Sequence, residues 1–469
     1  MVSHALHRLF APEYMVKESL VKGSLPQTKE AYQTAFGVAG AAMAESLFIA
    51  LIGMADTVMV STVGERAIAA VGLAGQPRYL VQTIAFAMNV AVTSICARRK
   101  GEEDRDGALR CLKQSVLLSA VLSIVLSVVF MPFSRDLILF MGAESDTVFW
   151  ATQYFQILLL GIPFNNLSLT ICAAQRGIGN TKVSMWTNMS ANAVNLVLNY
   201  GLINGKWGLP RLEVAGAAIA TIIGWAVGLV IALLSVAPTT SYLHLYSKGG
   251  WSPDKKLLVS MWKVSSGSFV EQVCMRVGFI SYSKIVAGLG TLMLAAHHIF
   301  INILSLSFSF GDGLSISAAS LVGQNLGAER PDLSIVYGKV CQRMALIAST
   351  AVFILFAISG KDMIRLFSSD TQILDVGRVI LIFMGIIVFG QSAQMVFMGC
   401  LRGAGDTMYT AIISMFSITL LRPALAFLFA YTLGWGLIGA WGALLADQYL
   451  RLVLTYRRFS SGNWVSIKL

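Results

Sequence analysis

Long apolar segments recur along the whole chain and are separated by short polar ones. A helix needs about 20 mostly apolar residues to cross a hydrocarbon core of about 30 Å. Backbone amides inside a bilayer must find partners within their own segment, so these runs are predicted to be helices. The predicted spans cover residues 33–63, 72–97, 108–132, 149–174, 182–203 and 214–235, then 257–287, 293–322, 340–359, 373–400, 409–432 and 436–456. We therefore expect an all-α integral membrane protein with about twelve transmembrane helices.

The second six spans repeat the first six at a constant offset of 226 residues. At this offset Glu45 meets Glu271, Gly64 meets Gly290 and Gly101 meets Gly327. The motif Arg-Gly-x-Gly-x-Thr at 176–181 also meets its copy at 402–407. Each copy has an even number of spans, so both enter the membrane from the same side and are related by a pseudo-twofold axis along the membrane normal. The pattern predicts two six-helix lobes whose rocking gives alternating access to a cavity between them.

Composition and charge agree with this architecture and indicate its orientation. Hydrophobic residues make up 56% of the chain and charged residues only 13%, too few for the charged surface of a soluble protein of this length. Most of the 35 Lys and Arg residues fall in loops on the side of the N-terminus, so the positive-inside rule places both termini in the cytosol. This bias also accounts for the net charge of +11 without a nucleic-acid partner.

The chain is expected to divide into five segments. These are a cytosolic lead-in at 1–32, an N-lobe at 33–236, a polar cytosolic linker at 237–256, a C-lobe at 257–458 and a cytosolic tail at 459–469. Residues 5–21 fit either an interfacial amphipathic helix or an ordinary lead-in, and we expect the lead-in. The six cysteines lie in or beside spans without pairwise spacing, which argues against a disulfide or metal framework.

Four short motifs occur in order between residues 33 and 464. They are Gly-Met-Ala-Asp-Thr-Val-Met-Val at 53–60, Leu-Val-Gly-Gln-Asn-Leu-Gly-Ala at 321–328, Gly-Cys-Leu-Arg-Gly-Ala-Gly-Asp-Thr at 399–407 and Arg-Phe-Ser-Ser-Gly-Asn-Trp at 458–464. Their order, spacing and duplication resemble the multidrug and toxic compound extrusion (MATE) family. The resemblance implies a secondary antiporter that exports small amphipathic, cationic drugs or toxins in exchange for protons or sodium. We expect a monomer in the inner (plasma) membrane, in contact with lipid, with a small-molecule substrate and no cofactor.

Asp56 is the first candidate for ion coupling. An ionisable side chain within a span is costly and by default is a functional candidate. Asp56 lies near the outer end of the first span and matches the N-lobe aspartate at which the resembled family couples ion binding to transport. A carboxyl at this place would bind a proton from one side of the membrane and release it to the other. The alternative is a carboxylate that caps neighbouring amides near the water interface.

Four asparagines in the fifth span are expected to share one helix face. Asn188, Asn192, Asn195 and Asn199 are spaced by four, three and four residues, and Asn195 and Asn199 reach about the depth of Asp56. Amides can hydrogen-bond both protonation states of a carboxyl. We therefore assign ion coupling to Asp56 with Asn192, Asn195 and Asn199, although the stripe would equally join helices. The resembled family often has aspartate in place of Asn199, so a carboxylate is missing and a proton is favoured over sodium.

A substrate cavity is expected to be lined by spans 1, 2, 4, 5, 7, 8 and 10. Its predicted lining residues are Glu45, Gln76, Asn188, Glu271, Asn302, Asp312 and Gln391. Glu45 and Glu271 suit an organic cation, or else anchor the lobes against Arg276 or Lys284. The eighth span carries a polar stripe, with His298, Asn302, Ser305, Ser309 and Asp312 three or four residues apart, although solvated or loop-bonded histidines remain an alternative. Gln391 stands where sodium-coupled members of the resembled family carry an acid. Arg422 is expected to pair with Asp447 or to cap backbone that Pro423 frees.

Two other functions would require different residues. A flippase for lipid-linked saccharides, from the same superfamily, would be expected to have a more basic cavity for pyrophosphate. An intramembrane enzyme would need a nucleophile with a base, or metal ligands at membrane depth. His297 and His298 are adjacent and have no further His or Cys near them in sequence, which argues against a metal site.

Overall fold

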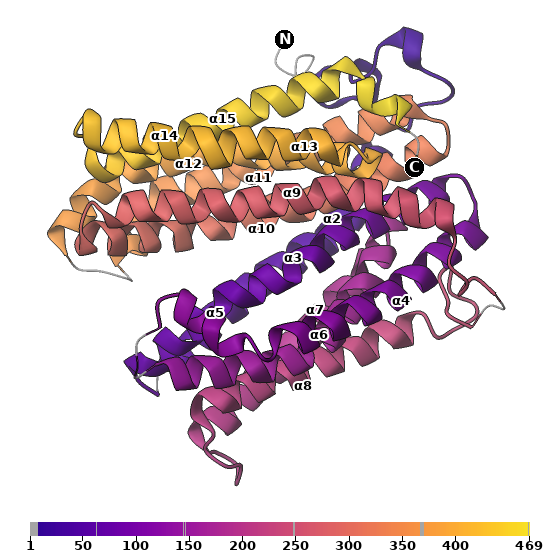
Figure 1. The fold of residues 1–469 in the computed structure, drawn as a ribbon. Helices are drawn as coiled ribbons and strands as arrows, with labels where there is room; N and C mark the ends of the chain where they lie inside the picture. The colour runs from indigo at the N-terminus through magenta and orange to yellow at the C-terminus, as the bar shows by residue number, and fades with distance from the viewer. Residues whose placement is uncertain are drawn as a thin grey trace. The chain divides into compact units, whose positions relative to one another are not determined.

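The computed structural model describes residues 8–61, 63–143, 145, 147–246, 249–365, 370–467 and 469. Every regular element within these residues is a helix, and twelve of the helices are long (Figure 1). In chain order they are α2 (Thr28–Ser61), α3 (Glu65–Gly101), α4 (Arg105–Phe130), α6 (Val148–Gly177), α7 (Thr181–Asn204), α8 (Glu213–Ser235), α9 (Lys255–Ala287), α10 (Thr291–Gly327), α11 (Pro331–Arg365), α12 (Thr371–Ala404), Thr407–Thr432 and α15 (Gly436–Ser461). The helix Thr407–Thr432 combines α13 (Thr407–Ser414), α14 (Arg422–Phe427) and two π-helical segments, η3 (Met415–Leu421) and η4 (Leu428–Thr432). Shorter helices are α5 (Ser134–Phe140), η1 (Pro12–Tyr14), η2 (Glu18–Leu20) and η5 (Asn463–Ser466).

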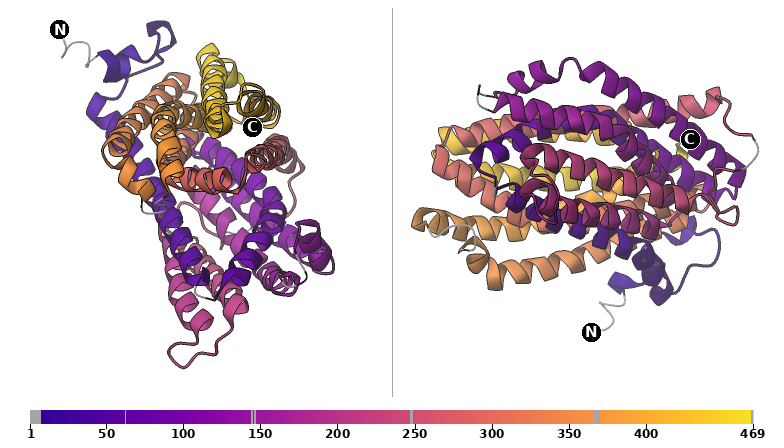
Figure 2. Two further views of the ribbon diagram at one scale, coloured as in Figure 1. Left: turned by 90° about the vertical axis from the view of Figure 1, so that its left-hand side faces the viewer. Right: turned by 90° about the horizontal axis from the view of Figure 1, so that it is seen from below.

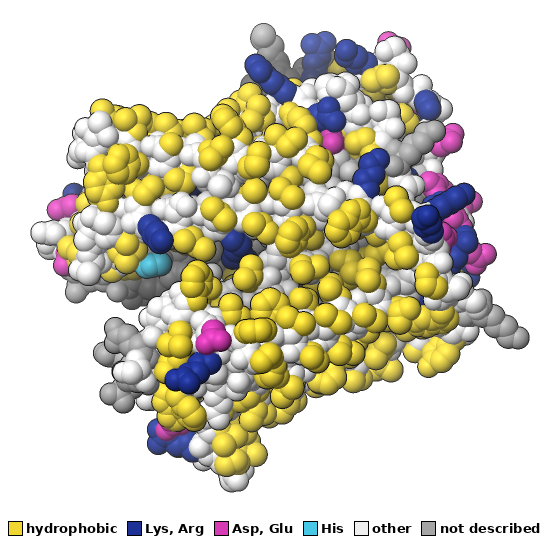
Figure 3. Space-filling model, in the orientation of Figure 1, with side chains coloured by type: hydrophobic (Ala, Val, Ile, Leu, Met, Phe, Trp, Pro, Cys, Tyr) yellow, Lys and Arg dark blue, Asp and Glu magenta, His cyan; other side chains and the backbone are white. Residues whose placement is uncertain are grey.

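The long helices have the length and composition of membrane spans. In the part of the chain that the structure describes, nine pass as spans by themselves, and α10 makes ten when its two segments are joined. The two remaining helices, α7 and α9, carry the asparagine series and the charged residues Glu271, Arg276 and Lys284. Figure 3 shows hydrophobic side chains covering the helices in view, with Lys and Arg mainly toward the helix ends. The predicted all-α membrane fold is confirmed.

The two predicted repeats share the same backbone landmarks. Helices α3 and α10 each have 37 residues, and both their first and their last residues are 226 apart. Glu103 and Glu329, also 226 apart, both have positive φ angles, 57° and 56°. A positive φ is uncommon for a residue other than glycine. The same unusual turn at equivalent places therefore shows that the sequence repeat is a structural repeat.

The helices pack into two compact units. One contains residues 47–262 and the other contains residues 1–46 and 263–469. The first half of α2, with Glu45, therefore packs with the C-terminal helices, whereas the predicted N-lobe began at residue 33. Asp56, on the second half of the same helix, belongs to the N-terminal unit. A helix of 34 residues is about 51 Å long, which allows its two halves to pack in different units.

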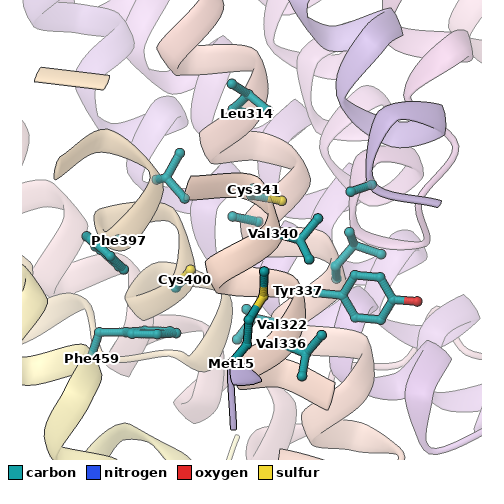
Figure 4. Packing of buried hydrophobic residues seen from close by; sticks show 14 of the residues in the cluster. Met15, Leu314, Val322, Val336, Tyr337, Val340, Cys341, Phe397, Cys400 and Phe459 are labelled. Atoms are coloured by element: carbon teal, nitrogen blue, oxygen red, sulfur yellow. The ribbon is translucent and has the colours of Figure 1, made fainter. Parts of the chain in front are cut away.

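Both terminal segments pack on one apolar cluster in the C-terminal unit. Met15 is buried in it beside Val336, Tyr337 and Val340 of α11 (Figure 4). Trp464 is also buried there, stacked on Phe459 at a ring distance of 5.2 Å. The view in Figure 2 shows the N-terminal segment against the helices of this unit. The described part of the lead-in is thus a segment that packs on the helices of the C-terminal unit.

The linker, residues 237–256, packs on α4 of the N-terminal unit. Arg105 of α4 donates hydrogen bonds to the carbonyl oxygens of Ser241 and Tyr242, at 2.6 and 3.0 Å. Lys113 of α4 donates to the carbonyl oxygen of Gly249 at 2.7 Å. Lys113 is the repeat counterpart of Lys339, which donates to the carbonyl oxygen of Met15 at 2.6 Å. In each repeat, therefore, a lysine holds the segment that covers the third long helix.

Replacing Gly177 with alanine is expected to destabilise the protein by about 1–3 kcal/mol. A Cβ at this position would lie 2.6 Å from the backbone oxygen of Thr93, so α3 and α6 would have to separate. Gly403, its counterpart in the second repeat, would meet the backbone oxygen of Ala319 in the same way, and Gly403→Ala should have a similar effect. Thermal unfolding of the purified protein in detergent measures both. Gly72→Ala is the control because no atom lies within 4 Å of its added Cβ; an equal loss in that variant would contradict the packing argument.

Candidate functional site

Asp56 lies among amide groups in the N-terminal unit. The amide nitrogen of Asn199 donates a hydrogen bond to Asp56 Oδ1 at 2.9 Å. With the Asn195 amide oriented to satisfy its neighbours, its nitrogen lies 3.1 and 3.2 Å from the two carboxylate oxygens, and its oxygen faces the Thr221 hydroxyl at 3.1 Å. Asn195 and Asn199 are buried, and Asp56 is half-buried. This arrangement brings together one titratable group and two neutral hydrogen-bonding groups from α2 and α7.

The other two asparagines of α7 take different positions. The Asn192 side chain donates to the carbonyl oxygen of Asn188 at 2.8 Å, which is a bond within its own helix. The structure therefore does not join Asn192 to Asp56, although the spacing predicted that it would be part of the coupling group. The cause is the competition of a helix carbonyl for a nearby amide, which is common for short polar side chains. Thr221 of α8 was not predicted, because nothing in the sequence relates it to Asp56.

Glu271 of α9 forms an ion pair in the C-terminal unit. Its carboxylate lies 2.5 Å from Arg402 Nη2, and it accepts hydrogen bonds from Thr410 at 2.9 Å and Ser414 at 3.4 Å. The Glu271 side chain is 1% exposed, so its charge needs this compensation. The sequence had suggested Arg276 or Lys284 as partners. Arg402 was noted only as part of the repeated glycine loop, because the link between them spans 131 residues.

A cavity of about 510 Å³ lies next to this ion pair. Its walls come from α9, α10, α12, the helix Thr407–Thr432 and α15. Glu271, Asp312 and His298, all singled out from the sequence, line it, together with Arg402. The eleventh and twelfth long helices also contribute, although the predicted lining did not include them. Most other lining groups are apolar or aromatic.

A second buried charge cluster lies at the same cavity. Asp447 of α15 pairs with Arg422 and accepts from Arg451 at 3.1 Å and from Ser417, all inside the unit. The expected pairing of Arg422 with Asp447 is confirmed. Ser417 lies in η3, a π-helical segment, and such segments are frequent at functional sites. Arg422 and Arg451 line the cavity as well, so the cluster is part of its wall.

The remaining predicted residues are dispersed. Glu45 is buried on α2, whereas Gln76 on α3 and Asn302 on α10 are exposed. Gln391 is buried on α12, and its side-chain oxygen has no hydrogen-bond partner among the described residues. In the eighth span, Asp312 accepts from the Ser46 hydroxyl at 3.3 Å, and Ser309 donates to the Ser46 carbonyl oxygen at 3.3 Å. Of this stripe, His298 lines the cavity, Ser309 packs against α2, and Asp312 does both.

The predicted lining also omitted several polar residues of the cavity wall. Gln394, Gln448 and His297 are almost fully buried, and within the described residues one polar atom of each has no hydrogen-bond partner. His297 packs against the rings of Tyr282 and Trp441, so it is neither solvated nor bonded in a loop. Lone glutamines in apolar helices give no periodic pattern, which is why the sequence did not indicate them.

Comparison with known proteins connects this geometry to a family. The MatE family model matches residues 41–201 and 268–428, two segments whose starts are 227 residues apart, against the offset of 226 read from the sequence. The chain is 30% identical over 458 residues to the "Probable multidrug resistance protein NorM" of Thermotoga maritima, covering 96% of this chain and 97% of that one. It is 28% identical to the "Uncharacterized transporter YisQ" of Bacillus subtilis, and the match covers 88% of this chain and 91% of that one.

The fold has solved counterparts as well. A structure described as the outward-facing conformation of a multidrug resistance MATE family transporter matches with a TM-score of 0.85, at 20% identity, covering 95% of this chain and 99% of that one. The family model covers both repeats and more than half of the chain. The intramembrane enzyme considered above is thereby excluded. The chain belongs to the MATE family and is a multi-pass membrane transporter.

Proposed function

We propose that the protein exports small amphipathic, cationic compounds in exchange for protons, with sodium as the alternative coupling ion. The observation that carries this proposal is the contact of Asp56 with the amides of Asn195 and Asn199. The name of a relative, the "Probable multidrug resistance protein NorM" of Thermotoga maritima, agrees with drug export.

The chemistry of the Asp56 group suits a proton. Amide nitrogens donate to the ionised carboxylate, and rotated amides offer oxygen acceptors to the protonated carboxyl. Both forms of Asp56 therefore find partners without a change of backbone. A sodium ion would need several oxygen ligands around it, whereas a proton needs only the Asp56 carboxyl and the two neighbouring amides. We assign the proton to Asp56 for this reason.

The cavity of the C-terminal unit has the size and chemistry of a small-molecule chamber. Its volume of about 510 Å³ lies in the range of drug-sized ligand pockets, and its wall combines apolar and aromatic side chains with many polar and charged ones. Three arginines, Arg402, Arg422 and Arg451, are matched by the acids Glu271, Asp312 and Asp447 around it. This balance gives no excess of positive charge for a pyrophosphate, so it does not favour the lipid-saccharide flippase.

We further propose an inner-membrane location with both termini in the cytosol. The excess of Lys and Arg on the side of the termini supports this orientation. Cysteine labelling from one side of intact cells tests it, and labelling of either terminus from outside would contradict it.

Transport into inverted membrane vesicles tests the function. In such vesicles an exporter moves substrate into the lumen, so an acidic lumen should drive uptake of cationic dyes in exchange for protons. We expect uptake with a proton gradient and none with a sodium gradient alone or with anionic dyes. Uptake that is independent of either gradient would contradict antiport, and uptake restricted to anionic dyes would contradict the substrate class.

A further inference from the structure

A separate groove lies between α11, α12 and α15 of the C-terminal unit, away from the cavity described above. Its volume is about 450 Å³. Most of its length is apolar, formed by Leu346 of α11, Phe389 and Ala393 of α12, and Leu452 and Val453 of α15. None of these residues has a part in the proposed transport chemistry. Val453 is 45% exposed, and Ile347 and Ile382 on the same helices are 55% and 61% exposed, so this is an outer, lipid-facing side of the helices.

One end of the groove is basic. Lys339 and Arg343 lie one helical turn apart on α11 and both line the groove. Lys339 donates to the carbonyl oxygen of Met15 at 2.6 Å, and Arg343 donates to that of Leu9 at 3.2 Å and to Gln342 at 2.9 Å. An ammonium has three N–H donors and a guanidinium five, so both groups keep donors beyond these bonds. Among the described residues, neither has a carboxylate within ion-pair distance.

The predicted span boundaries place the basic end at the depth of the lipid headgroups. The span predicted from hydropathy begins at residue 340, directly after Lys339, and Tyr456 at the end of the last span lines the same groove. Tyrosine is typical of the membrane–water interface, where its hydroxyl meets water and its ring meets lipid. From Lys339 to Leu346 the helix rises about 10 Å, so the apolar part of the groove extends into the hydrocarbon layer.

We propose that this groove binds an anionic phospholipid of the cytosolic leaflet. Two like charges one turn apart repel each other, and a phosphate headgroup between them would remove that repulsion. The apolar part would hold one acyl chain beside Phe389 and Val453. Basic pockets between helices on the cytosolic side are suited to acidic headgroups, whereas a zwitterionic lipid adds no net charge. The lipid would also hold the N-terminal segment in place, because Lys339 and Arg343 donate to the carbonyl oxygens of Met15 and Leu9 in that segment.

Native mass spectrometry of the delipidated protein tests the site. Phosphatidylglycerol and phosphatidylcholine are added back separately at equal concentrations, and the bound lipid is counted. The parent should retain one phosphatidylglycerol in preference to phosphatidylcholine. The double variant Lys339→Gln/Arg343→Gln should lower phosphatidylglycerol binding roughly tenfold to thirtyfold. Val453→Trp, which fills the groove but leaves both charges, should also lower it.

Lys113→Gln is the matched control. This substitution removes the equivalent lysine of the first repeat, which donates to the carbonyl oxygen of Gly249 in the linker. The variant protein should bind phosphatidylglycerol like the parent. Loss in Lys113→Gln equal to that in the double variant would mean that the effect is general, and would overturn the site. Unchanged binding in both groove variants would do the same. If the double variant lost phosphatidylglycerol binding but Val453→Trp kept it, the site would bind a headgroup without an acyl chain, which would overturn the lipid groove. Displacement of the lipid by inorganic phosphate would indicate a phosphate site and would overturn it as well.

Discussion

Substitution of Asp56 by asparagine is expected to reduce gradient-driven efflux to the level of vesicles without the protein. The variant keeps the size of the side chain and part of its hydrogen bonding to Asn195 and Asn199, but it cannot gain or lose a proton. Without that titration an imposed proton gradient has no carrier at this site. Uptake of a cationic dye by inverted vesicles with an acidic lumen measures the loss.

A transport control and two folding controls make this result specific. Asp136→Asn, a change of the same kind at an exposed position on α5, should transport like the parent. Asp56→Asn should be retained in the membrane at the level of the parent and unfold at a similar temperature. If it transported normally under a proton gradient, Asp56 would be structural and the coupling group would have to be sought at Glu45, Glu271 or Asp312.

Substitution of Asp447 by asparagine is expected to be the most destabilising change in the C-terminal unit, by about 3–5 kcal/mol. Asp447 and its partners Arg422 and Arg451 are almost fully buried, with side-chain exposures of 0%, 3% and 7%. Removing the carboxylate leaves two buried guanidinium charges without compensation. The thermal unfolding midpoint of the protein in detergent measures the effect.

Two further variants test the cause. Asp375→Asn breaks the exposed pair with Arg378 and should change stability by no more than about 1 kcal/mol. Replacing Asp447 by leucine and both arginines by methionine removes all three charges together, and it should recover much of the loss, because the cost lies in unpaired charge rather than in the absence of the pair. An Asp447→Asn variant as stable as Asp375→Asn would contradict this account.

Several parts of the candidate site were accessible from the sequence. Helical periodicity placed Asn195 and Asn199 on one face at the depth of Asp56, and the structure joins these three side chains. The same periodicity included Asn192, which instead bonds to its own helix. A shared face is therefore necessary for contact but does not decide which partner an amide takes. Arg422 and Asp447 were paired correctly because both are buried charges that need compensation.

The helices, their repetition at 226 residues and the membrane class could be predicted without the structure. These properties are local or periodic, because hydropathy, helical spacing and the repeated glycine motifs depend on consecutive residues or on a register that recurs. Helix packing brings Glu271 to Arg402 and places His297, Gln394 and Gln448 in the wall of one cavity. Most of these residues are far apart in the chain or on different helices, and their meeting depends on how the helices rotate and pack. No pattern within a single helix contains that information.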